Sequence, residues 1–167
     1  MKIIFLIVTL VTLSFSREYI GTIVKVTDGD TIQVQSNSEI LSIRVLYIDT
    51  PEKFGGSKLE KDSKQTGINS KKLQELGKLS SNYASKFFKK DDVVKVVSYK
   101  KDRYGRLLGE IYKNNINYSY KIVSDGYACI YKQEKYPMEL SALLIDAKSK
   151  RNGLWGVNYQ AMEALCY

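Results

Sequence analysis

The sequence predicts an α+β fold in which five β-strands close into a small barrel and three α-helices pack against it. Two observations lead to this prediction. Short runs of β-branched residues, separated by turn signals, fill the N-terminal third of the chain and recur near its middle. Apolar residues at helical spacing follow each group of strands, and no repeat or low-complexity segment interrupts the pattern.

The first three strands are expected to pair in chain order. Tyr19–Val26 and Thr31–Val34 are rich in β-branched residues, and the Asp-Gly sequence within Asp28–Asp30 favours a hairpin turn between them. A third strand is predicted over Ile40–Ile48, where apolar residues partly alternate with polar ones. Pro51 ends this strand, because proline has no backbone N–H for a ladder hydrogen bond.

A long polar segment separates these strands from the first helix. Lys53–Asn69 is rich in lysine and glycine, and we predict that it is a loop. The helix is expected to begin near Ser70, with Gly77 as a weak point within it. Its apolar residues recur at helical spacing: Leu73, Leu76, Leu79, Tyr83 and Phe87.

The second half of the chain completes the barrel and adds two helices. Val93–Tyr99 and Leu107–Tyr112 are the predicted fourth and fifth strands. One helix is predicted over Ile116–Ser124, with Gly126 as its C-terminal signal, and another over Pro137–Arg151.

The N-terminus has the three-part layout of a secretory signal peptide. Lys2 precedes the apolar run Ile3–Leu13, and the small-x-small ending Ser14-Phe15-Ser16 precedes the expected cleavage point after Ser16. The run is shorter than the ~20 residues of a membrane-spanning helix. We therefore expect residues 1–16 to be a leader and residues 17–167 to form a single exported domain, whether periplasmic, secreted or at the cell surface. A buried N-terminal strand and an uncleaved membrane anchor are the alternatives.

The composition limits the chemistry that is available. The chain has no histidine, which excludes Ser-His and Cys-His catalysis and His-ligated zinc or haem. Its 26 Lys and Arg residues exceed its 18 Asp and Glu residues, so the formal net charge is +8. A strongly basic chain favours a polyanionic partner, either nucleic acid or an anionic membrane surface.

The two cysteines, Cys129 and Cys166, allow two interpretations. In an oxidising compartment they would form a disulfide that ties the C-terminal tail to the rest of the domain. Two independently buried thiols are the alternative, and the sequence does not decide between them. Neither cysteine is a candidate catalytic residue.

Acidic and basic residues concentrate in three short segments, each at a strand end: Asp28–Thr31, Arg44–Glu52 and Asp102–Arg106. Each segment alone could be only a turn or a charged hairpin tip, but their joint occurrence favours a site. The carboxylates of Asp30 and Asp49, with a backbone carbonyl near Thr50, are hard oxygen ligands that suit Ca²⁺. The sequence therefore predicts a calcium site with room for water and a substrate oxygen.

Three further residues are candidate catalytic residues for hydrolysis of a phosphodiester. Arg44 and Arg106 can each bind phosphate oxygens through two N–H groups and stay charged at any usable pH. Glu52 could accept a proton from an attacking water. A general base contributes about 10²–10⁴-fold, which is less than phosphate-ester hydrolysis requires, so most of the acceleration must come from charge stabilisation. Loss of Arg44 or Arg106 is expected to cost at least as much activity as loss of Glu52.

At these residues the sequence resembles the staphylococcal nuclease (thermonuclease) family. The shared pattern is an Asp-Gly-Asp-Thr turn, an Arg followed by Asp-Thr-Pro-Glu, and an Asp-x-Tyr-Gly-Arg hairpin, and the resemblance runs from about Tyr19 to Trp155. It implies an OB-type five-stranded barrel with three helices and Ca²⁺-dependent cleavage of DNA and RNA, with the 5′-oxygen as leaving group and 3′-phosphates as products. The implied roles are calcium ligands for Asp30, Asp49 and the Thr50 carbonyl, phosphate binding for Arg44 and Arg106, and base or water-orienting group for Glu52.

The resemblance also implies two aromatic contacts to the nucleotide, Tyr104 and Tyr131. We expect a monomer that prefers single-stranded DNA and RNA. One departure from the family pattern is Lys53–Asn69, which exceeds the corresponding staphylococcal segment by about a dozen residues and could either grip a single strand electrostatically or be a tolerated mobile loop.

Two other functions compete with a nuclease. A non-catalytic OB-fold module would bind nucleic acid in a basic groove without turnover. The retained Asp30, Asp49 and Glu52 argue against it, because a binder has no need of acids that face an anionic ligand. A protein held at a membrane surface by an uncleaved Ile3–Leu13 segment is the third hypothesis.

Overall fold

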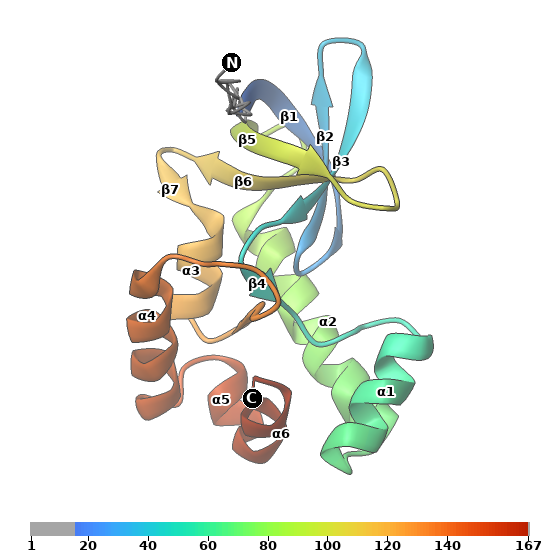
Figure 1. Cartoon of the computed structure of the whole chain (residues 1–167), viewed down its shortest axis with the longest axis vertical. Helices are drawn as coiled ribbons and strands as arrows, with labels where there is room; N and C mark the ends of the chain where they lie inside the picture. The colour runs from blue at the N-terminus through green and yellow to red at the C-terminus, as the bar shows by residue number, and fades with distance from the viewer. Residues whose placement is uncertain (1–15, 167) are drawn as a thin grey trace, which may run out of the picture.

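Five strands of the barrel pair in the order β3-β2-β1-β5-β6, and a parallel pairing of β3 with β6 closes the sheet. The structure is a computed structural model that describes residues 16–166, so residues 1–15 of the predicted leader lie outside the described part. In Figure 1 the barrel strands occupy the upper half of the molecule and the helices lie below them. The bounds of the barrel strands are β1 Arg17–Asp28, β2 Thr31–Ser36, β3 Glu39–Val45, β5 Val93–Lys101 and β6 Leu107–Lys113.

The barrel forms where the β-branched runs predicted it. Asp28 pairs with Thr31 at the end of β1 and β2, so the Asp-Gly signal produces the predicted tight turn. Alternate residues of each strand point inward and exclude water, as the period of two requires. The fully buried interior includes Ile23, Ile32, Val34, Ile43, Val96 and Ile111.

The third strand is shorter than predicted. β3 ends at Val45, and Tyr47 adopts a positive φ of 69°, which turns the chain away from the barrel. The next two residues form β4 (Ile48–Asp49), which pairs with β8 (Cys129–Ile130) in a separate two-stranded sheet. The predicted strand Ile40–Ile48 is therefore wrong at its end, because alternation of apolar residues continued across the turn and concealed it.

The predicted loop Lys53–Asn69 contains a helix, which corrects that part of the prediction. The helix α1 covers Ser57–Thr66 and ends at Gly67, whose φ of 69° suits glycine. Leu59 is its one fully buried side chain. A single buried apolar residue among lysines and acids produces no helical periodicity, so this helix could not be predicted from the sequence pattern.

The predicted helices occur, with small shifts at their starts. The first is α2 (Ser70–Phe87), capped by the Asn69 side chain. The second is α3 (Tyr118–Ser124), which starts two residues later than predicted because Ile116–Asn117 forms the short strand β7. The third is α4 (Met138–Ser149).

Two further helices complete the C-terminal end, so the described residues 16–166 hold six helices instead of three. They are α5 (Leu154–Val157) and α6 (Tyr159–Leu165). With α1, α2 and β8 they enclose a second apolar cluster, separate from the barrel core, around Leu73, Leu76, Leu154, Trp155 and Met162. Between residues 16 and 166 no helix combines the length and apolar character needed to cross a membrane.

Candidate active site

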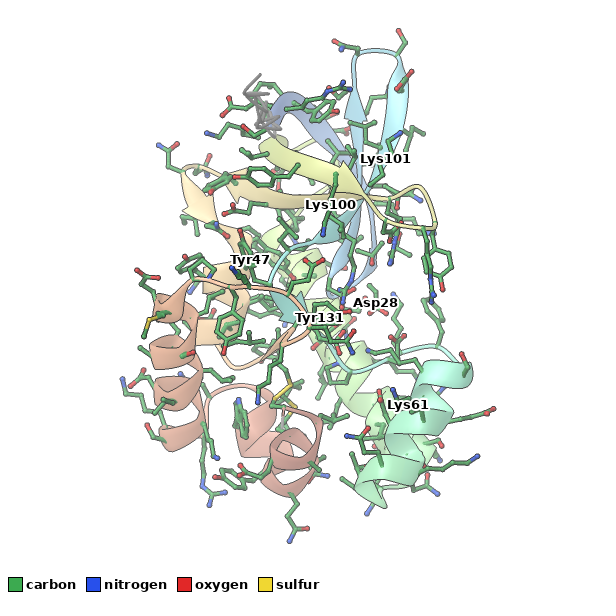
Figure 2. The ribbon with its side chains drawn as sticks, in the orientation of Figure 1. Asp28, Tyr47, Lys61, Lys100, Lys101 and Tyr131 are labelled. Atoms are coloured by element: carbon green, nitrogen blue, oxygen red, sulfur yellow. A yellow bond between two sulfur atoms is a disulfide. The ribbon has the colours of Figure 1, made fainter. Side chains whose placement is uncertain are left out.

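A cavity of about 1140 Å³ lies between the barrel wall, the β5–β6 hairpin, β4 with β8, and α1. Figure 2 shows where its lining comes from: Asp28 and Tyr131 lie near the middle of the molecule, Lys100 and Lys101 lie above them at the end of β5, and Lys61 lies below them on α1. All three predicted motifs reach this cavity. Of the predicted site residues, Asp30, Arg44, Asp49, Glu52, Tyr104, Arg106 and Tyr131 line it.

Asp30 lies at the turn into β2 and is held by a dense set of hydrogen bonds. Its Oδ2 accepts from the backbone N–H of Thr50 at 3.1 Å and from the Thr50 hydroxyl at 3.0 Å. Its Oδ1 accepts from the Thr31 hydroxyl at 3.1 Å. Burial opposes ionisation of this carboxyl, but Arg44, Lys58 and Thr50 outweigh it and lower the pKa of Asp30. Asp30 is therefore a buried carboxylate that stays charged.

Arg44 joins Asp30 to Asp49. It extends from β3, and its guanidinium forms an ion pair with Asp30 through Nη1 and another with Asp49 through Nη2, the second at 2.9 Å. Burial disfavours the charge of Arg44, but the two carboxylates raise its pKa above the ordinary value. The guanidinium is permanently charged and fixed at the side of the acidic pair.

Asp49 experiences a different environment from Asp30. It lies on β4, and burial and then the negative charge of Asp30 raise its pKa, against the effect of Lys58 and Arg44. Two carboxylates that share one guanidinium repel each other, and a second positive charge nearby relieves that repulsion.

Arg106 reaches the same cavity from the β5–β6 hairpin. Asp102 fixes it: Oδ2 accepts from Arg106 Nε at 2.7 Å, and Oδ1 accepts from the backbone N–H groups of Tyr104 and Arg106 at 2.9 and 3.0 Å. The Arg106 Nη1 group donates to the Thr31 hydroxyl at 3.4 Å, and that hydroxyl donates to Asp30. Thr31 therefore links the second guanidinium to the acidic pair.

An aromatic ring lies beside each guanidinium. The Arg106 Cζ is 5.6 Å from the ring centroid of Tyr104, and the Arg44 Cζ is 5.9 Å from that of Tyr131. Tyr104 is 69% exposed, although Arg103 also lies over its ring, with Cζ 4.8 Å from the centroid. The Tyr131 backbone N–H donates to the Tyr47 carbonyl at 2.8 Å, which fixes that segment against β4. The structure brings both tyrosines to the site, and their role in binding stays a prediction.

Lys58 is a site residue that the sequence analysis missed. It extends from the first turn of α1, and its Nζ lies 2.9 Å from Glu52 Oε1, 3.2 Å from Asp49 Oδ1 and 3.3 Å from the Thr50 carbonyl oxygen. Burial opposes its charge, but Asp49 and Glu52 raise the pKa of Lys58 above its ordinary value. Because the segment was expected to be a loop, none of its lysines could be assigned to the site.

The oxygen atoms around Lys58 fit the predicted calcium site. The carboxylate of Asp49 and the Thr50 carbonyl converge on one positive charge, which shows that this donor set accepts a cation. Within residues 16–166 there is no cluster of three or more His, Cys, Asp or Glu side chains with metal-binding geometry. The predicted ligands Asp30, Asp49 and the Thr50 carbonyl supply only two carboxylates, so water and substrate would have to complete the coordination of a hard cation such as Ca²⁺.

The two cysteines form a disulfide next to this site. Cys129 and Cys166 are bonded, with 5.1 Å between their Cα atoms. The structure therefore has the disulfide and not the two independently buried thiols. Cys129 is the register partner of Asp49 in the β4–β8 pair. The disulfide therefore connects the C-terminal helix to the strand that positions a candidate metal ligand.

The model of the family described as staphylococcal nuclease homologue matches residues 42–157. An uncharacterized protein MJ1439 of Methanocaldococcus jannaschii is 35% identical over 150 residues, which cover 83% of this chain and 72% of that protein. The endonuclease YhcR of Bacillus subtilis is 33% identical over 160 residues, 90% of this chain but only 12% of that much longer protein. An uncharacterized endonuclease of Escherichia coli is 31% identical over 136 residues, which cover 81% of this chain and 76% of that protein.

Proposed function

We propose that this chain, which belongs to the staphylococcal nuclease homologue family, is a Ca²⁺-dependent nuclease. Its substrates would be DNA and RNA. The observation that carries the proposal is the convergence of two guanidiniums and two carboxylates from three distant segments on one cavity. Relatives that are named endonucleases support the same reaction class. An excess of basic residues over acidic ones favours a polyanionic substrate.

Arg44 and Arg106 would bind the scissile phosphate. Both are held in place by carboxylates, Arg44 by Asp30 and Asp49 and Arg106 by Asp102, so they need little rearrangement to receive an anion. Negative charge grows on the phosphoryl oxygens as the reaction proceeds, and two fixed guanidiniums stabilise it. A bound Ca²⁺ would add a further positive charge at the phosphate.

Glu52 would act on the attacking water. Its carboxylate would accept the proton of the water while the water oxygen forms its bond to phosphorus. The bond from phosphorus to the 5′-oxygen would break as the new bond forms, and the departing 5′-oxygen would take up a proton from solvent water. The products would be a 3′-phosphate and a 5′-hydroxyl.

Tyr104 and Tyr131 would contact the nucleotide beside the phosphate, because each ring adjoins one of the two guanidiniums. An unpaired strand exposes bases that can stack on such rings, which favours single-stranded substrates. We also propose that the protein is exported as a monomer after removal of residues 1–16. The Cys129–Cys166 disulfide supports export, because disulfides persist in oxidising compartments.

The test is cleavage of an end-labelled single-stranded DNA by the purified protein. Cleavage should require Ca²⁺, stop when a chelator is added, and give 3′-phosphate ends that block extension by a polymerase until a phosphatase removes them. Glu52→Gln should still bind the DNA but cleave it far more slowly. Binding by the unaltered protein without any cleavage would instead support a non-catalytic OB-fold module, and cleavage that survives chelation would remove the calcium role from Asp30 and Asp49.

A further inference from the structure

We infer that Lys58 is an internal cation that occupies the divalent-ion position of the site and has to leave before Ca²⁺ can bind. This inference rests on the calcium site of the proposed function. If Lys58 has this role, α1 is part of the site, and the Lys53–Asn69 segment is more than a tolerated loop.

The contacts of Lys58 are those of a cation among metal ligands. Its Nζ lies within hydrogen-bond distance of Asp49 Oδ1 and the Thr50 carbonyl oxygen, which are two of the three candidate calcium ligands. It also contacts Glu52, the candidate base, at 2.9 Å. One ammonium thus engages both parts of the reaction site. An ion and an ammonium cannot share these oxygens at the same distances, so the two compete.

The other contacts of these candidate ligands are made by Arg44 and Thr50. Arg44 holds the other side of the acidic pair, where it contacts both Asp30 and Asp49. The Thr50 N–H and hydroxyl bond to Asp30 Oδ2, whereas the Thr50 carbonyl oxygen accepts from Lys58 Nζ. Lys58 therefore faces the donors on the side that Arg44 leaves open.

Lys58 can leave without disturbing the fold. Its side chain is 41% exposed, so rotation of its flexible stem carries the ammonium into solvent. The neighbouring Leu59 is buried and keeps α1 in place during that movement. On the N-terminal side, Gly55 and Gly56 have no other atoms crowding their Cβ positions, which gives the start of α1 further freedom.

The competition predicts opposite effects on the two states of the site. Without Ca²⁺, replacement of Lys58 leaves Asp30, Asp49 and Glu52 opposite Arg44 alone, so the protein should unfold at a lower temperature. In the same variant Ca²⁺ no longer has to displace the Lys58 ammonium, so the ion should bind more tightly. We expect an increase in affinity of at least about fivefold, the lower end of typical coupling between two ligands.

The experiment measures the unfolding temperature of the full chain against Ca²⁺ concentration, at constant ionic strength and without nucleic acid. Lys58→Met is compared with the unaltered protein, with the charge-retaining Lys58→Arg, and with Lys64→Met as the matched control, an exposed lysine in the last turn of α1 that does not line the cavity. Lys58→Met should have the lower unfolding temperature in chelator, the larger rise with Ca²⁺ and the tighter dissociation constant. Lys64→Met and Lys58→Arg should resemble the unaltered protein. Equal or weaker Ca²⁺ binding by Lys58→Met overturns the inference.

A second measurement covers the case in which Lys58→Met fails to fold. In the unaltered protein with isotope-labelled lysine, the side-chain NMR signal of Lys58, identified by its loss in Lys58→Arg, should move toward the position of exposed lysines when Ca²⁺ is added. A signal that stays unchanged at saturating Ca²⁺ overturns the inference. Both readouts omit nucleic acid, so a protein that shows them but does not cleave DNA would contradict the proposed nuclease and leave the Lys58 inference standing.

Discussion

Asp28 is a buried carboxyl in the cavity that the proposed reaction does not use. Burial, followed by the negative charges of Asp30 and Glu52, raises the pKa of Asp28 to about 6. Because the folded protein holds this proton more tightly than the unfolded chain does, the carboxyl does not lower the free energy of unfolding at pH values well below its ordinary pKa. The destabilisation grows as the pH rises toward 6 and reaches its full size above that value.

Asp28→Asn is therefore expected to stabilise the protein at pH 8 and to have little effect at pH 4. The gain in the free energy of unfolding at pH 8 should be about 1–3 kcal/mol. Urea unfolding in the presence of chelator, at both pH values, measures it. Asp146→Asn, at an exposed position on α4, is the control. A gain of the same size at both pH values would contradict the assigned pKa.

The two arginines of the β5–β6 hairpin provide a matched pair for the proposed phosphate contact. Arg106 is fixed by Asp102 and hydrogen-bonded to Thr31, whereas Arg103 contacts the exposed Tyr104 ring. Arg106→Ala should lower kcat/KM for single-stranded DNA by about 10²-fold or more, at least as much as Glu52→Gln.

Arg103→Ala is the control, and it should leave kcat/KM within a few-fold of the unaltered protein. Circular dichroism establishes that both variants are folded. Equal losses in Arg103→Ala and Arg106→Ala would show that only the overall charge of the hairpin matters.

At the scale of single elements, strands and helices were predictable where one face is apolar and the other polar. Leu73 and Leu76 of α2 are buried at the expected spacing, and the barrel strands bury alternate residues. The helix α1 was not predictable, because Leu59 alone marks its buried face. The helices α5 and α6 follow Gly153 with only a few residues each, too short for a periodic pattern.

Leu59 gives α1 its main attachment to the second apolar cluster. Leu59→Ala should lower the free energy of unfolding by about 2–3 kcal/mol at most, because a helix at the edge of a cluster can settle into the space left behind. Hydrogen exchange should become faster in residues 57–66 and stay unchanged in the barrel strands.

Glu60→Ala, next to Leu59 on the exposed face of α1, is the control and should leave the exchange of residues 57–66 nearly unchanged. Exchange that becomes faster throughout the barrel would mean that α1 and the barrel unfold as one unit, contrary to the two separate clusters of buried residues.

In the whole molecule, the meeting of the three motifs at one site was predictable from the sequence, but the position of Lys58 among their carboxylates was not. Asp30 lies at the β1–β2 turn, Arg44 near the end of β3 and Arg106 just before β6, and the β2–β3 and β3–β6 pairings bring these positions together. Asp49 follows β3 on the short strand β4. Lys58 could not be assigned, because its position depends on how α1 packs on α2 and α6, which no short sequence pattern encodes.

The Cys129–Cys166 disulfide joins β8 to the C-terminal end of α6 within the second apolar cluster, and it closes a loop with a sequence separation of 37 residues. A crosslink of this length removes conformational freedom from the unfolded chain, so its reduction should lower the free energy of unfolding by about 3–4 kcal/mol. Urea unfolding with and without a reducing agent measures the difference. A Cys129→Ala and Cys166→Ala double variant, which should be insensitive to the reducing agent, is the control. Equal stability of the oxidised and reduced protein would mean that the bond does not constrain the chain.

The most direct measurement is a crystal structure of the protein with Ca²⁺ and a nucleoside 3′,5′-bisphosphate. The ion should be bound by Asp30, Asp49 and the Thr50 carbonyl, and one 5′-phosphate should contact the guanidiniums of both Arg44 and Arg106. A phosphate bound elsewhere on the barrel, or one that only a single guanidinium reaches, would contradict this arrangement.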